Sequence, residues 1–189
     1  VYVHKALGQT VANCHKFPNA IFRKKLLTMD EIVQSLNHSI NLIQKINPDS
    51  VIILTLSPVR HLKDGLIENA RSKANLLSAI HQSIEDHQSV FYFPSYDIMM
   101  DELRDYRFYD ADMIHPNETA IQYIWEKFQF IWLDPKVNGT MEAVDALQKS
   151  LAHKPFNEKS EAYLNFIAGV KQAQIRLETE FPHMKFQNT

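Results

Sequence analysis

An aspartate and a histidine three residues apart carry the strongest chemical signal in this sequence. They are Asp112 and His115, and Pro116 follows directly. At this spacing the carboxylate can accept a hydrogen bond from one imidazole nitrogen while the other nitrogen faces a reacting group. That is the orienter-and-base half of a nucleophilic hydrolase. A structural alternative stays open, in which Asp112 caps a turn and His115 caps a helix without any chemistry.

Two other polar segments are candidates for the same site. Asn13 and His15 flank Cys14, and we expect Asn13 to be an oxyanion-hole amide with His15 as a neighbouring donor. Arg60 and His61 follow a predicted strand, and we expect them at the rim of the substrate pocket. The structural alternatives are a polar loop around one buried thiol and a turn that ends the strand.

The sequence offers no serine in a turn typical of a hydrolase nucleophile. Ser57 is followed by Pro58 and lacks the flanking glycines of a strained nucleophile turn. Cys14 stays open as a nucleophile paired with His115, although buried and unreactive cysteines are more common. Because the chain opens on Val1 rather than on a methionine, we expect the attacking group to lie upstream of this sequence.

A metal site is the weaker interpretation of the nine histidines. The sequence contains neither His-x-x-x-His nor His-Glu-x-x-His, and the adjacent Cys14 and His15 are poorly placed to bind one ion together. We therefore expect no metal and no cofactor.

The composition is that of a folded protein, and its charge balance is not that of a general nucleic-acid or membrane-surface binder. The chain has 189 residues, of which 45% are hydrophobic and 22% charged. A formal net charge of −2 argues against binding of nucleic acid or of an anionic membrane surface. The single cysteine excludes an intrachain disulfide, and no apolar run reaches the length of a membrane span. These features predict a cytoplasmic location.

Hydrophobic periodicity predicts an α/β fold. A hairpin is expected over residues 1–12, and Thr28 with Glu31 forms a capping box at the start of a helix that ends near Asn47. A strand over residues 51–56, a helix over 66–86 and a strand over 90–93 then predict a parallel sheet with a crossover helix. Both strands lack alternation, which predicts burial on both faces.

The remaining segments predict a polar loop and three helices. The loop covers residues 101–114, and a helix follows that begins at Pro116, with His115 or a near neighbour as its cap, and ends near Leu133. Amphipathic helices are expected over residues 141–151 and 160–181. We expect residues 1–133 to form the α/β domain and residues 134–189 a helical hairpin that packs on it.

Two parallel strands and a hairpin are too few for a stable open sheet. We therefore expect further strands, from a missing N-terminal segment or from another chain, to complete it.

Several motifs in order make the sequence resemble the bacterial GSCFA domain family, which is placed by similarity with the SGNH (GDSL-like) hydrolases. The motifs cover nearly the whole chain, and the chain resembles the C-terminal portion of such a protein. They are Val11-Ala12-Asn13-Cys14-His15-Lys16, Ser57-Pro58-Val59-Arg60-His61, Tyr92-Phe93-Pro94-Ser95-Tyr96, and the segment from Asp101 to Tyr109 that leads to Asp112-x-x-His115-Pro116.

The resemblance implies a flavodoxin-like, three-layer α/β/α sandwich whose first strands are absent from this chain. It implies Ser-His-Asp hydrolysis of a carboxylic ester, with an O-acyl group on carbohydrate as one substrate class. Asp112 takes the orienter role and His115 the base role. The Gly-Ser-Cys-Phe-Ala signature that would hold the serine is not in this sequence, and neither is the Gly-x-Asn-Asp element, so the chain alone is expected to be inactive. The alternative function is a non-catalytic carbohydrate- or anion-binding or assembly module with the same fold.

Overall fold

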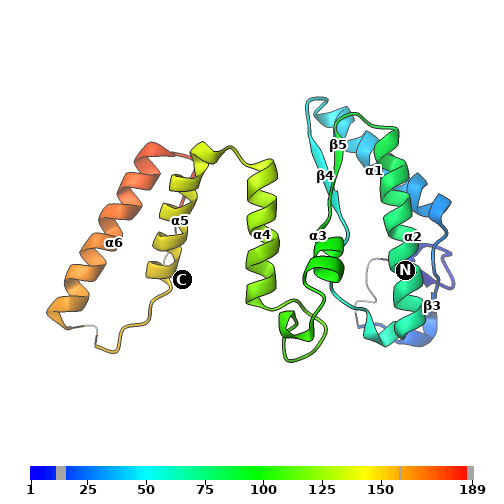
Figure 1. Cartoon of the computed structure of the whole chain (residues 1–189), viewed down its shortest axis with the longest axis horizontal. Coiled ribbons are helices and arrows are strands. Elements are labelled where there is room, and N and C mark those ends of the chain that lie inside the picture. Colours follow the sequence, from blue (N-terminus) through cyan, green and yellow to red (C-terminus); the bar gives the residue numbers. More distant parts are fainter. Residues whose placement is uncertain (12–15, 158, 187–189) are drawn as a thin grey trace. The chain divides into compact units, whose positions relative to one another are not determined.

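The computed structural model describes residues 1–11, 16–157 and 159–186. The protein is a mixed α/β chain with two small sheets and a larger share of helix (Figure 1). It divides into two compact units, Val1–Phe128 and Gln129–Thr189. The division after residue 133 that the sequence suggests stays a prediction.

The first sheet is antiparallel and contains the predicted hairpin. Strand β1 (Tyr2–His4) pairs with β2 (Thr10–Val11) on one side and with β3 (Phe22–Lys24) on the other. Gly8 lies in the hairpin turn with φ 66°, a conformation that glycine adopts without steric cost, and its N–H donates to the His4 carbonyl at 2.8 Å. The hairpin is confirmed, whereas β3 was not predicted.

Helix α1 (Met29–Ile46) begins and ends where the sequence predicts. The Thr28 hydroxyl accepts from the Glu31 N–H at 3.3 Å, and the Glu31 carboxylate accepts from the Thr28 N–H at 3.0 Å. The two bonds satisfy backbone donors that the helix itself leaves unpaired. Asn47 is extended, as a residue before proline should be, and it ends the helix.

The second sheet is parallel and has the predicted crossover. Strand β4 (Ile52–Thr55) pairs in register with β5 (Val90–Phe93), and α2 (Leu66–Glu85) connects them. Burial on both faces is wrong for the described residues. Ile52 to Leu54 are only half-buried, and Phe91 is 40% exposed between better-covered neighbours. An apolar run shows that a strand can be buried on both faces. Whether its side chains are buried depends on which elements pack against the strand.

The segment after β5 is more helical than predicted. Helix α3 (Ser95–Asp97) continues as a π-helical turn over Ile98–Glu102, and a 3₁₀ turn covers Tyr106–Phe108. Ile98 and Met99 are buried and contribute to the core of the first unit. The 101–114 loop therefore carries ordered turns that fix the direction of its side chains.

Helix α4 (Glu118–Trp132) starts later than predicted. Its cap is the near neighbour Asn117 and not His115, because the Asn117 side chain accepts from the Ala120 N–H at 3.1 Å. Pro116 precedes the helix in an isolated antiparallel bridge with Tyr109. The His115 ring therefore does not cap the helix.

The second unit contains the two amphipathic helices that the sequence predicts. Helices α5 (Asn138–Leu151) and α6 (Glu161–Glu180) lie side by side (Figure 1) and share a buried apolar core. The core consists of Leu147, Val170 and Leu177. Across residues 1–11, 16–157 and 159–186, no helix combines the length and the apolar character needed to cross a bilayer.

Candidate functional site

Asp112 and His115 form a hydrogen-bonded pair on the surface of the first unit. The Asp112 Oδ2 lies 2.6 Å from the His115 Nδ1. The side chains are 45% and 58% exposed, respectively. Among the described residues, the opposite ring nitrogen Nε2 of His115 has no hydrogen-bond partner, so it is open to a reacting group. The pair thus has the contact that an orienter and a general base require.

Backbone hydrogen bonds fix the segment that carries the pair, residues 110–117, which we call the dyad loop. The Asp112 Oδ1 accepts from the backbone N–H of Ile114 at 2.8 Å and of His115 at 3.0 Å. The Asp110 N–H donates to the His115 carbonyl at 2.8 Å and closes the loop. Met113 has φ 58°, which is uncommon for a residue with a side chain and marks a tight turn.

Hydrogen bonding keeps the Asp112 carboxylate charged. The backbone N–H of His115 contributes most, followed by the His115 ring and the N–H of Ile114, and together they lower the pKa of Asp112 to about 2. At neutral pH the carboxylate is therefore ionised, and it can stabilise a positively charged imidazole. The turn-capping role and the orienting role of Asp112 are compatible, because they use different carboxylate oxygens.

Arg60 joins the loop after β4 to the dyad loop. Its backbone N–H donates to the Ile114 carbonyl and its Nη1 to the Met113 carbonyl, both at 3.4 Å. The guanidinium lies over the Tyr109 ring at 4.1 Å and the Tyr106 ring at 5.5 Å. Arg60 is thus brought next to the dyad loop, and its role at the rim of a substrate pocket stays a prediction.

The other predicted site residues are not brought to the dyad by any described contact. The His61 backbone N–H donates to the Asn69 side chain at 2.9 Å, and the residue is exposed. Asn13 and His15, together with Cys14, lie outside the described residues. Their proposed roles stay predictions.

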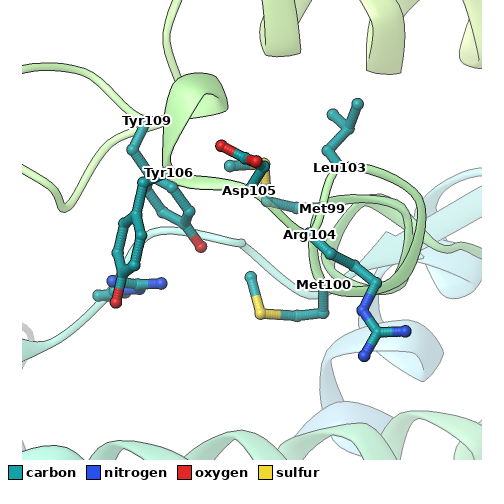
Figure 2. A pocket seen from close by; sticks show the side chains of 8 residues that line it. Met99, Met100, Leu103, Arg104, Asp105, Tyr106 and Tyr109 are labelled. Atoms are coloured by element: carbon teal, nitrogen blue, oxygen red, sulfur yellow. The ribbon is translucent and has the colours of Figure 1, made fainter.

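A shallow hollow of about 230 Å³ begins at Arg60, and we call it the Arg60 hollow. Figure 2 shows Tyr106 and Tyr109 on one side of it and Arg104 on the other, with Met100 between them. The hollow shares Arg60 with the contacts that hold the dyad loop. Its lining residues are Arg60, Met99, Met100, Leu103, Arg104, Asp105, Tyr106 and Tyr109.

Two models of protein families match this chain. The model of the GSCFA family matches residues 1–128, about two thirds of the chain, and that of the GSCFA domain protein C-terminal domain matches residues 144–189. The chain belongs to the GSCFA family. No curated protein and no solved structure is significantly similar to it.

The GSCFA chain also holds a buried lysine that the sequence analysis missed. Lys73 of α2 is 7% exposed, donates to the Ser57 carbonyl, and lies 5.6 Å from the centre of the Tyr96 ring. Burial lowers the pKa of Lys73, because desolvation penalises its charged form. The bond anchors the end of β4, from which the Arg60 segment leaves. The sequence signal was a lysine among apolar neighbours on the inner side of a helix.

The serines near the end of β4 have structural partners. The Ser57 Oγ accepts from the Val59 N–H at 3.2 Å, which is a turn contact. Ser95 is buried, donates to the Leu56 carbonyl at 2.9 Å and lies 2.7 Å from the Thr55 hydroxyl. In the described ranges, no three His, Cys, Asp or Glu side chains converge as metal ligands.

Proposed function

We propose that this GSCFA chain supplies the general base and its orienter to an ester hydrolase of the SGNH kind. His115 takes the proton of a serine hydroxyl on Nε2, and the hydroxyl oxygen attacks the ester carbonyl. The protonated ring then gives that proton to the departing alcohol, and water releases the acyl group from the serine by the same route. Asp112 holds the ring through Nδ1 and balances its positive charge.

The observation that supports this proposal is the 2.6 Å contact between the Asp112 Oδ2 and the His115 Nδ1, with Nε2 open among the described residues. The first carboxylate oxygen is held by two backbone N–H groups, so the second oxygen is aimed at the ring. The serine in this proposal belongs to a part of the protein outside this sequence. Asn13 is its proposed oxyanion donor.

The proposal includes a flavodoxin-like, three-layer sandwich completed by further strands. The described part of the parallel sheet has only β4 and β5, and an isolated pair of strands is marginally stable in water. Half-burial of β4 is consistent with an additional strand or layer against it. These strands come from a preceding segment of the same protein or from another chain.

The deciding experiment is ester hydrolysis by the protein expressed from its full natural coding sequence, with p-nitrophenyl acetate as substrate. We expect His115→Ala to reduce kcat/KM by about 10³-fold or more, because an essential base is lost. His38→Ala on the exposed side of α1 is the matched control and should leave the rate unchanged. An unchanged rate in His115→Ala shows that the assigned base is wrong.

A second candidate function is a binding module without turnover. The observation in its favour is the Arg60 hollow, which offers cationic and aromatic groups whether or not a nucleophile is present. Labelling of the full protein by a fluorophosphonate probe, which reacts with activated serines, would eliminate this candidate. Absence of labelling together with tight ligand binding would support it.

A further inference from the structure

The Arg60 hollow carries two guanidinium groups that are not neutralised within the described residues. Arg60 and Arg104 line it, and in that part of the chain neither forms an ion pair. Arg60 donates one side-chain N–H to the Met113 carbonyl at 3.4 Å, a long bond that leaves most of its five donors available. Figure 2 shows Arg104 on the opposite side of the hollow from the tyrosines on which Arg60 lies. Positive charge thus borders both sides of the hollow.

The one acidic residue in the lining is already balanced. Asp105 accepts from the backbone N–H of Arg107 at 2.9 Å and from its guanidinium at 3.2 Å. These two bonds lower the pKa of Asp105, so its carboxylate is charged and matched by Arg107, which does not line the hollow. An anion entering the hollow therefore meets an excess of positive charge.

The rest of the lining is apolar and aromatic. Met99 and Leu103 of the lining are buried, and Tyr109 is buried beneath the Arg60 guanidinium. Tyr106 is 63% exposed and presents its ring next to that guanidinium. An exposed aromatic face suits the C–H face of a sugar ring, and a guanidinium fork suits a carboxylate.

We propose that the Arg60 hollow binds an acidic sugar, with its carboxylate on a guanidinium of Arg60 or Arg104 and its ring against Tyr106. Arg60 also bonds to the Met113 and Ile114 carbonyls, so a ligand on Arg60 lies beside the dyad loop. The ester attacked by the dyad is then carried by an acidic carbohydrate. This last step rests on the proposed function, whereas the binding itself does not.

The test measures binding of trigalacturonic acid and of a neutral trisaccharide, maltotriose, to the full natural protein by titration calorimetry at low salt. We expect the acidic sugar to bind at least about tenfold more tightly, and Arg104→Gln to remove about tenfold of that affinity, since a lost charge-assisted bond has this magnitude. Arg60→Gln should do the same. Because Arg60 also holds the dyad loop, the exposed Arg104 is the safer position. Arg71→Gln, which removes an α2 charge paired with Glu68 and outside the hollow, should leave binding unchanged.

A second pair of variants tests the ring contact. Tyr106→Phe should keep the affinity for trigalacturonic acid and Tyr106→Leu should weaken it, because only the former retains an aromatic face. Equal affinity for the neutral sugar, or equal loss in Arg71→Gln, overturns the proposal. The proposal is also overturned if Tyr106→Leu keeps its affinity for trigalacturonic acid and acetate competes fully with that sugar. Such a result would mean that the hollow binds simple anions.

The proposed function and the acidic-sugar site can fail separately, and the two failures are distinguishable. His115→Ala should bind trigalacturonic acid as the unmodified protein does, because binding needs no base. If His115→Ala loses hydrolysis of p-nitrophenyl acetate while no acidic sugar binds, the hydrolase proposal stands and the acidic-sugar site falls. If the sugar binds and His115→Ala hydrolyses p-nitrophenyl acetate normally, the acidic-sugar site stands and the hydrolase proposal falls.

Discussion

The dyad loop and the second unit are held together by different forces. In the dyad loop, Asp112 and His115 are exposed, and the geometry depends on hydrogen bonds to carboxylate and carbonyl oxygens. In the second unit, α5 and α6 are joined by apolar side chains, of which Leu147 and Leu177 are each 2% exposed. The hydrogen-bonded side chains of the dyad loop are exposed to solvent, whereas the apolar side chains between α5 and α6 are buried.

This difference predicts that substitutions act on separate properties. Exposed hydrogen bonds contribute little to the free energy of folding, because water replaces the lost partner. Buried methyl and methylene groups contribute much more, because their loss leaves a cavity. Changes in the dyad loop should therefore alter chemistry with little change in stability, and changes in the helical core should do the opposite.

The largest expected effect is that of Asp112→Asn on ester hydrolysis by the full natural protein. The amide oxygen can still accept from the N–H groups of Ile114 and His115, but the negative charge that balances the imidazolium is lost. We expect kcat/KM to fall by about 10³–10⁴-fold, as for other histidine–aspartate pairs, with a loss of stability that is small beside that of a core substitution.

Asp110→Asn is the matched control, because it makes the same change in the same loop without touching the His115 ring. Its kcat/KM should stay close to that of the unmodified protein. An equal fall in both variants would mean that loop structure, not the orienting charge, accounts for the loss.

The second effect is on stability and comes from Leu177→Ala in α6. Removing this buried side chain should lower the free energy of unfolding of the second unit by about 2–5 kcal/mol. Ile175→Ala on the same helix removes a side chain that is 56% exposed, and it should cost about 0.5 kcal/mol or less. Urea denaturation monitored by hydrogen exchange of the backbone amides of α5 and α6 measures the loss of stability in both variants. Similar losses in the two variants would contradict a core centred on Leu177.

Sequence alone predicted the elements that depend on local physics. The capping box at Thr28, the stop before Pro48 and the order of β4, α2 and β5 follow from side-chain chemistry and periodicity within a short window. The contact of Asp112 with His115 was also predictable, because three residues of a tight turn are enough to bring them together.

Features that depend on distant packing were not predictable. The helix was expected to begin at Pro116, yet α4 begins at Glu118 with Asn117 as its cap, since the bridge between Pro116 and Tyr109 delays the start of the helix. The Arg60 hollow unites a residue after β4 with turns after β5. Its π-helical turn has no short sequence signature that would aim those side chains.

The third effect concerns an exposed polar cluster with a purely structural role, the capping box of α1. Thr28→Ala leaves the Glu31 N–H without its cap and should cost about 1 kcal/mol of stability without changing ester hydrolysis. Ser39→Ala in the middle of the same helix is the control. Its hydroxyl donates only to the Ser35 carbonyl, so its loss should be neutral or slightly stabilising. A clear loss of hydrolysis in Thr28→Ala would remove the distinction between this cluster and the dyad loop.

The smallest effect is a pH dependence that separates the backbone bonds of the dyad loop from its ring contact. Folding lowers the pKa of Asp112 from an ordinary 3.8 to about 2. A carboxyl group with a lowered pKa stabilises the folded state above its ordinary pKa, and this contribution disappears as the pH falls from about 4 to about 2. The difference in unfolding midpoint between the unmodified protein and Asp112→Asn should therefore shrink across that window, as measured by urea titration at each pH.

His115→Ala sharpens the same measurement. The largest cause of the lowered pKa is the backbone N–H of residue 115, which alanine keeps, whereas the ring contact is second. We therefore expect His115→Ala to retain most of the pH dependence while it loses the base. If the dependence vanishes with the ring, the carboxylate is held chiefly by the imidazole of His115. The ring contact, and not the backbone turn, would then fix the position of the Asp112 carboxylate.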